Sequence, residues 1–291
     1  MDSERAFTVA KGVTLHYRLW RGRDRRPLLV LLHGMASNLT RWSEFFEHTI
    51  LKERFDILRL DLRGHGGSFT RQRVGMEVWS DDLAAILKEQ GYDSGLFVGH
   101  SLSANLALHF AARYPENVSA LVLIDPVFTD ALRGQALWVY RLSPLLRIVI
   151  FLIRVLNALG LHRRQIPNRD LRQLDEHVRK QLLGAGKEED FVKRYTSPLA
   201  DMKHIATATY LQEFIEITRP IPPTPLRAPI LVLISQAVTF TDTDATRAAL
   251  ARYPNCEIVK LSAYHWPLTE KPVEVRQTIE AWCAKFLART R

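Results

Sequence analysis

The chain has 291 residues, 47% of them hydrophobic and 24% charged, which is typical of a globular protein with a large core. Its formal net charge is +9, but no nucleic-acid-binding motif accompanies the basic residues, so we expect no nucleic-acid partner. The only cysteines, Cys256 and Cys283, cannot make a disulfide framework or a metal centre. The charged first residues have no apolar run behind them, so we expect no secretory signal and a cytoplasmic location.

The first 60 residues predict the start of an α/β sheet. Residues 7–10 and 13–20 alternate apolar and polar side chains on either side of Lys11-Gly12, which indicates a β-hairpin. Residues 28–32 are a continuous apolar run, as in a strand of a parallel sheet that is covered on both faces. A helix over 42–53 and a second strand over 56–60 follow.

Residues 61–68, Asp-Leu-Arg-Gly-His-Gly-Gly-Ser, follow that strand, and we interpret them as a tight structural loop. Residues 76–90 predict a helix that places Trp79 and Leu83 on one face, and Gly91 ends it.

A strand, a sharp turn and a helix are predicted over residues 95–114. Ser101 lies on the turn between Gly99 and Ser103, two small residues that let the strand and helix approach closely. The serine oxygen then stands above the sheet, at the N-terminus of the helix. Ser101 is therefore the candidate nucleophile.

After a strand at 120–124, which ends in Asp125-Pro126, the alternation of strands and helices stops. Helices are predicted at 144–161, 168–183, 188–195 and 201–217, and a proline-rich linker follows at 220–225. We therefore predict a helical cap, residues 127–225, inserted into a core made of residues 1–126 and 226–291.

The predicted cap carries much of the positive charge, because residues 133–172 contain eight arginines and one acidic residue. Arg147 and Arg154 interrupt the apolar segment 144–161, so it predicts an amphipathic helix rather than a membrane-spanning one. We expect its arginines to face solvent or to associate weakly with an anionic membrane surface. Its apolar face is predicted to line the substrate pocket together with Trp138, and this face consists of Leu145, Ile148, Leu152 and Leu156.

The sheet pattern resumes with a strand at 230–234, a helix at 245–251, a strand at 257–261 and a closing helix to about residue 287. His265 lies in the loop after the last of these strands, in the sequence Tyr-His-Trp-Pro. A serine hydroxyl needs such a base to take its proton, so His265 is the candidate base.

Four ordered motifs resemble those of the α/β-hydrolase superfamily: His33-Gly34 after a strand, the loop 61–68, the turn 99–103 and the loop His265-x-Pro267 with a second proline at 272. The resemblance covers the sheet domain and implies a doubly wound, mainly parallel eight-stranded sheet with an inserted helical cap. It also implies an oxyanion hole made by the backbone N–H groups of Met35 and Leu102. Gly34 and Trp266 would then lie at the substrate pocket.

The acid that orients His265 is not given by the motif. Most members of the superfamily have an aspartate where this chain has Val238. Asp125 ends the preceding strand of the sheet and is our first candidate. Asp242 is the alternative, and it is equally suited to satisfy free amides at a helix N-terminus.

The resemblance implies a serine hydrolase without metal or organic cofactor. It would cleave a carboxylic ester, a thioester or a lactone, or a C–C bond on the same machinery, in a small-molecule substrate with an apolar acyl chain. The alternative prediction is a non-catalytic ligand-binding relative, because Val238 replaces the usual acid.

Overall fold

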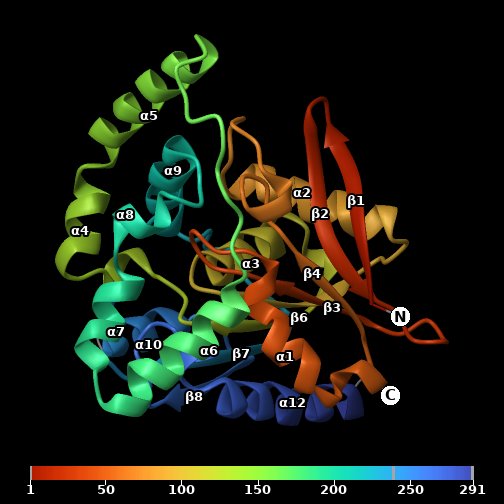
Figure 1. The fold of residues 1–291 in the computed structure, drawn as a ribbon. Coiled ribbons are helices and arrows are strands. Elements are labelled where there is room, and N and C mark those ends of the chain that lie inside the picture. The colour runs from red at the N-terminus through yellow and green to blue at the C-terminus, as the bar shows by residue number, and fades with distance from the viewer. Residues whose placement is uncertain (1, 238–239, 290–291) are drawn as a thin grey trace.

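The computed structural model describes residues 2–237 and 240–289, and their eight strands form one sheet in the order β1-β2-β4-β3-β5-β6-β7-β8 (Figure 1). β2 is antiparallel to β1 and β4, and the other neighbouring pairs are parallel. The predicted mainly parallel sheet is confirmed. The strands are β1 (Asp2–Ala10), β2 (Val13–Trp20), β3 (Leu28–Leu32), β4 (Asp56–Leu60), β5 (Gly95–His100), β6 (Val118–Ile124), β7 (Ile230–Ser235) and β8 (Cys256–Leu261).

Helices cover both faces of this sheet. The longer helices of the doubly wound part are α1 (Ser43–His48), α2 (Met76–Glu89), α3 (Leu102–Arg113), α10 (Thr243–Leu250) and α12 (Pro272–Arg289), with the short α11 (Pro267–Glu270) before α12. Residues of α2, α3 and α10 share one hydrophobic cluster with the sheet, and residues of α1 and α12 share the other. The sheet therefore separates two apolar layers.

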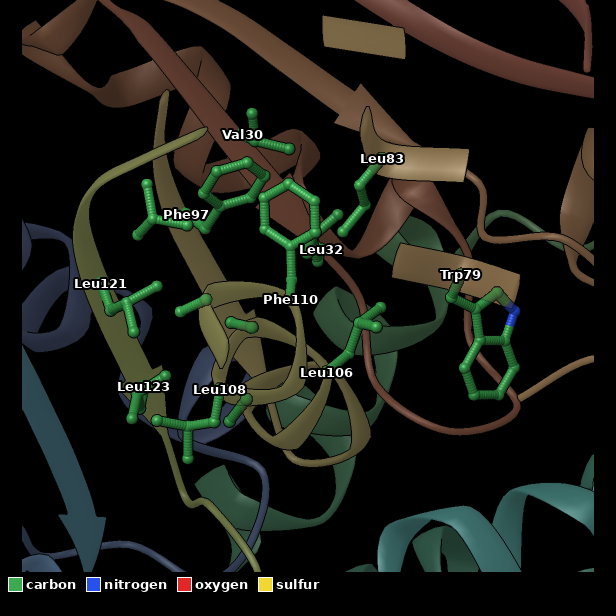
Figure 2. Close-up of a cluster of buried hydrophobic side chains, with 14 of the residues drawn as sticks. Val30, Leu32, Trp79, Leu83, Phe97, Leu106, Leu108, Phe110, Leu121 and Leu123 are labelled. Atoms are coloured by element: carbon green, nitrogen blue, oxygen red, sulfur yellow. The ribbon is translucent and has the colours of Figure 1, made fainter. Parts of the chain in front are cut away.

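The strand β3 shows how a continuous apolar run serves both layers. Its alternate residues Leu28, Val30 and Leu32 belong to the cluster under α2 and α3, whereas Leu29 and Leu31 belong to the cluster under α12. Figure 2 shows the first cluster, in which side chains of β3, β5 and β6 meet those of α2 and α3. Because successive strand side chains point to opposite faces, a strand that is covered on both sides favours apolar residues at every position.

Six α-helices lie between β6 and β7 in the described chain: α4 (Gly134–Arg141), α5 (Ser143–Ala158), α6 (Leu171–Gln181), α7 (Glu188–Tyr195), α8 (Pro198–Asp201) and α9 (Thr207–Ile217). We call them the inserted helices. Sequence patterns predicted neither α4 nor the break between α8 and α9. None of the described helices is long and apolar enough to cross a membrane.

The predicted helix over 42–53 is wrong in its continuity. The structure has the 3₁₀ helix η1 (Leu39–Trp42), then α1, then a second 3₁₀ helix, η2 (Ile50–Glu53). The break falls at Thr49, whose backbone is extended and whose hydroxyl oxygen accepts a hydrogen bond from the Leu51 amide. A threonine that caps a new helical turn in this way ends the one before it.

The loop 61–68 is structural, as the sequence analysis interpreted it. The Asp61 carboxylate accepts hydrogen bonds from the Leu39 and Gly67 amides, each at 2.7 Å. The Ser68 hydroxyl donates to the Asp61 carbonyl oxygen at 2.7 Å and accepts from the His16 amide at 2.7 Å. The loop thus joins β2, β4 and η1 behind the site.

The turn between β5 and α3 has the strained backbone that its sequence predicted. Ser101 has φ 54° and ψ −113°, a region that residues with side chains rarely adopt. A Cβ atom at Gly99 would lie 2.2 Å from the carbonyl oxygen of Ser103. Only glycine therefore lets α3 fold back so closely over the end of β5.

We predict that Gly99→Ala destabilises the protein by at least about 2 kcal/mol, because its methyl group would meet backbone atoms that cannot turn aside. Urea unfolding measures this. The matched control is Gly184→Ala, whose Cβ atom would meet its nearest neighbour at 3.5 Å, an ordinary contact. Equal stability of the two variants would contradict the proposed close approach.

Candidate active site

Ser101 and His265 come together at the carboxyl end of the sheet. The Ser101 Oγ atom is 2.7 Å from His265 Nε2, which is a hydrogen-bond distance. Ser101 precedes α3, and His265 lies in the loop between β8 and α11. The hydroxyl can donate its proton along this bond when the imidazole is neutral.

Asp125 lies on the other side of the imidazole. Its Oδ2 atom is 3.8 Å from His265 Nδ1, longer than a hydrogen bond but within ion-pair distance. Asp125 Oδ1 accepts a hydrogen bond from the Ser235 amide and Oδ2 accepts one from the Ser235 hydroxyl, both at 2.7 Å. These bonds fix the carboxylate at the end of β6. Like Ser101, Asp125 has a left-handed backbone, with φ 48°.

The structure uses Asp242 differently. Its Oδ1 atom accepts a hydrogen bond from the Ala245 amide at 2.8 Å, which caps α10, and its Oδ2 atom lies 3.6 Å from Arg133. Among the described residues, the only carboxylate within 4.0 Å of His265 is that of Asp125. Val238, which stands at the usual position of the acid, lies outside the described residues.

Burial favours the neutral forms of both His265 and Asp125. Burial, assisted by the nearby His100, lowers the pKa of His265 to about 3. Burial raises the pKa of Asp125 to about 7, although the hydrogen bonds from Ser235 oppose this rise. His265 is therefore unprotonated near neutral pH and has its lone pair free to accept the serine proton.

Leu102, one of the two residues predicted to form the oxyanion hole, directly follows Ser101 in the chain. Leu102 is the first residue of α3, so its N–H group has no partner within the helix. Met35 lies in the loop after β3 and lines the same cavity as Ser101. The next residue, Ala36, has φ 48°, and its amide donates to Glu213 Oε2 at 3.0 Å. The loop is thereby tied to α9.

Glu213 and His65 form a fully buried ion pair behind this loop. Burial opposes a charge on His65, but the Glu213 carboxylate next to it raises the pKa of the imidazole. One carboxylate of an inserted helix therefore holds both the Ala36 amide and the loop 61–68. Its sequence context in α9 gave no sign of this role.

His33 and Ser103 hold the loop after β3 from the other side. The His33 Nδ1–H group donates to the Gly34 carbonyl oxygen at 2.8 Å, and Nε2 accepts from the Leu62 amide at 3.1 Å. Burial keeps the pKa of His33 well below its ordinary value, so it is a neutral support rather than a base. The Ser103 hydroxyl donates to the His33 carbonyl oxygen, which joins the turn at Ser101 to the loop at Met35.

A cavity of about 440 Å³ opens over Ser101 and His265. Gly34, Met35 and Trp266, which the sequence analysis placed at the substrate pocket or oxyanion hole, are among its lining residues. Much of the remaining wall is apolar and comes from the segment between β6 and β7. Its aliphatic and phenylalanine side chains from the inserted helices are Ala136, Val139, Leu146, Leu211, Phe214 and Ile217, and Met202 follows α8.

The residues of α4 and α5 that were predicted to line the pocket do not do so. They are between 45% and 62% exposed and are absent from the cavity wall: Trp138, Leu145, Ile148, Leu152 and Leu156. For α5 the reason is its orientation about the helix axis. Leu146, Ile150 and Ile153 face α9, and the opposite apolar face points outward. An amphipathic pattern shows that two faces differ, but both faces of this helix are apolar.

Several residues at the site were missed by sequence reasoning. Phe240, in the loop after β7, packs edge-on against His265 with ring centroids 5.0 Å apart. The His100 imidazole donates from Nε2 to the His265 carbonyl oxygen at 2.9 Å and so fixes the histidine loop.

Two arginines of the cavity wall were also missed. Arg41 is paired with Asp175, and Arg169 is paired with Asp201. No motif marks any of these residues.

Residues 27–272 match the alpha/beta hydrolase fold family, so the chain belongs to that family. It is 35% identical over 115 residues to a 2-(acetamidomethylene)succinate hydrolase of Mesorhizobium japonicum, which covers 38% of this chain and 39% of that protein. The chain thus spans about two fifths of that relative's length. It is 24% identical over 283 residues to the sn-1-specific diacylglycerol lipase ABHD11 of Mus musculus, covering 94% and 86% of the two chains.

Among solved structures, an esterase from Thermogutta terrifontis superposes with a TM-score of 0.64 at 22% identity, over 98% of this chain and 99% of that chain. This likeness concerns the fold. Together with the family match, it confirms the predicted superfamily.

We predict that Asp125→Asn changes stability in a pH-dependent way. Because burial raises the pKa of Asp125 to about 7, the folded state binds more protons than the unfolded state between about pH 4 and 7. The stabilisation from the protonated carboxyl is complete below pH 4 and is lost as pH rises through 7. The Asn variant should therefore gain stability relative to wild type between pH 5 and 8, by several degrees in Tm.

Thermal unfolding at pH 5 and pH 8 measures this difference. The matched control is Asp242→Asn, at a half-buried helix cap, which should differ from wild type by the same small amount at both pH values. A relative stability of Asp125→Asn that is independent of pH would rule out the raised pKa.

Proposed function

We propose that this protein is a serine hydrolase that cleaves carboxylic esters through an acyl-enzyme on Ser101. The observation that carries the proposal is the 2.7 Å hydrogen bond between the Ser101 hydroxyl and His265 Nε2, at the floor of a 440 Å³ cavity. A largely buried, neutral imidazole at this distance is the base that a serine nucleophile needs. The family's relatives named as an esterase, a lipase and a hydrolase support the same class.

In the proposed reaction, Ser101 Oγ attacks the carbonyl carbon of the ester, and the hydroxyl proton passes to His265 Nε2. The carbonyl oxygen becomes an oxyanion that accepts hydrogen bonds from the Met35 and Leu102 amides. The C–O bond to the alcohol then breaks, and His265 returns its proton to the leaving oxygen. A water molecule attacks the acyl-enzyme by the same proton transfers and releases the carboxylic acid.

Asp125 is proposed as the acid of this triad. As an ionised carboxylate it would stabilise the imidazolium that forms when His265 takes the serine proton. Its two hydrogen bonds from Ser235 hold it in place while it does so. The same residues could also cleave thioesters, lactones and C–C bonds next to a carbonyl group.

The acyl side of the substrate is proposed to be apolar, because aliphatic and aromatic residues of α4, α5 and α9 form much of the wall beside Ser101. Arg41 and Arg169 lie in the same wall but are each paired with an aspartate.

We predict that Ser101→Ala lowers kcat on the order of 10³-fold or more, since loss of a nucleophile removes the acyl-enzyme route. The wild type should also react with a fluorophosphonate probe, and the variant should not. Mass spectrometry of the labelled protein locates the adduct. A folded wild type that neither reacts with the probe nor hydrolyses p-nitrophenyl esters would favour a non-catalytic ligand-binding protein instead.

We predict that Asp125→Asn lowers kcat about a hundredfold or more, because the comparable change in a serine protease costs about 10⁴. Asp242→Asn should have little effect, since asparagine caps a helix almost as well as aspartate. Steady-state kinetics with p-nitrophenyl butyrate decides between them. The reverse pattern would transfer the role of the acid to Asp242.

A further inference from the structure

An exposed apolar surface covers the outer side of α4, α5 and the turn after α5. Sixteen large hydrophobic residues are exposed among the described residues, and twelve of them lie between 138 and 161. We call these twelve the α4–α5 surface. They are Trp138, Tyr140, Leu142, Leu145, Ile148, Val149, Phe151, Leu152, Val155, Leu156, Leu159 and Leu161.

The regular spacing of these residues makes α5 a helix with an uncovered apolar stripe. Leu145, Ile148, Leu152, Leu156 and Leu159 recur every three or four residues and are between 45% and 71% exposed. Burial is confined to the other side of the helix, where Ile150 is only 2% exposed and packs against α9. α5 lies at the upper left edge of the molecule, and no other element covers it there (Figure 1). A stripe of this extent is unusual for a surface that remains in water.

Unpaired positive charge flanks the stripe. Arg133, Arg169 and Arg172 form ion pairs with carboxylates. The other five arginines of residues 133–172 have no carboxylate within 4.0 Å in the described part of the chain: Arg141, Arg147, Arg154, Arg163 and Arg164.

Arg154 differs from the other four arginines. It lies four residues after the buried Ile150, so it is on the side of α5 that faces α9 rather than on the stripe. Its Nε atom is buried and has no hydrogen-bond partner among the described residues. The arginines that can meet an anionic surface beside the stripe are therefore Arg141, Arg147, Arg163 and Arg164.

We propose that the α4–α5 surface docks on an anionic lipid bilayer. The apolar stripe would enter the boundary between headgroups and acyl chains, while the flanking arginines contact lipid phosphates. Trp138 is 62% exposed, and its ring centroid lies 5.7 Å from the guanidinium carbon of Arg141. A tryptophan ring is amphipathic and prefers this boundary. In this arrangement α5 lies along the bilayer surface, since its apolar residues form a stripe on one side.

Charge decides between a bilayer and a second copy of the chain. In a two-fold dimer through this surface, the same unpaired arginines would face one another across the interface. An anionic bilayer offers the opposite charge over the whole surface and apolar depth for the stripe. A bilayer therefore satisfies both features of the surface at once.

The same helices also border the candidate active site. Ala136 and Val139 of α4 and Leu146 of α5 line the cavity, while the α4–α5 surface faces outward. Docking would therefore place the bilayer one helix thickness from the cavity. This consequence rests on the proposed function: acyl esters dissolved in the bilayer would have the shortest path to Ser101.

Co-sedimentation with vesicles tests the docking without reference to catalysis. Wild type should bind vesicles of phosphatidylcholine containing about a third phosphatidylglycerol at least about tenfold more tightly than pure phosphatidylcholine. Raising the salt from about 0.1 M to about 1 M should weaken the binding, because the Debye length falls from about 10 Å to about 3 Å. Ser101→Ala should bind as wild type does, so failure of the hydrolase proposal leaves this result intact.

The decisive variant is the double substitution Ile148→Asp/Leu152→Asp, which should weaken vesicle binding at least tenfold. Its matched control is Ile50→Asp/Val273→Asp, at similarly exposed apolar residues on the α12 side of the sheet, which should bind normally. Hydrolysis of soluble p-nitrophenyl acetate by the first variant should stay near the wild-type rate, since neither side chain lines the cavity.

Two results would overturn the proposal. One is a folded wild type that does not bind the anionic vesicles, or that binds them equally well after Ile148→Asp/Leu152→Asp. The other is a dimer in analytical ultracentrifugation that this variant dissociates while vesicle binding is absent, which would make the surface an interface between copies.

Discussion

The left-handed backbone of Ser101 is the constraint on which the candidate site depends. It is reached only because Gly99 lets α3 fold back onto β5, and it directs the serine oxygen toward His265. The same turn leaves the Leu102 amide free at the helix start and sets Ser103 against the His33 carbonyl oxygen. One strained residue thus determines where the nucleophile, an amide donor and the neighbouring loop lie.

Buried polar contacts then join the inserted helices to the sheet. Glu213 of α9 holds the Ala36 amide and the His65 imidazole, and Arg41 of η1 reaches Asp175 of α6 and the Thr269 hydroxyl. Each of these groups would be costly to bury alone, so the helices and the loops around the site are stable only together.

The sequence predicted most of the sheet because β3 and all of β7 but its last residue are continuous apolar runs, whereas β2 alternates apolar and polar residues. It predicted Ser101 and His265 because each lies in a local motif. The acid was only ranked, with Asp125 before Asp242, since the position of a carboxylate beside His265 depends on how two strand ends meet in space. Phe240 and Glu213 gave no local signal at all. The outward face of α5 was misassigned because hydrophobic periodicity does not tell which apolar face is covered.

A single asparagine governs how the inserted segment joins the core. The buried Asn105 side chain donates to the Val127 and Ile217 carbonyl oxygens, at 2.7 Å and 2.9 Å, and accepts from the Val127 amide at 2.8 Å. Val127 precedes the inserted helices and Ile217 ends them, so both ends of a long loop close on one side chain of α3. The entropy of closing such a loop grows only with the logarithm of its length. Different helical inserts could therefore be exchanged between two anchored ends during evolution, with the reacting groups beneath them left undisturbed.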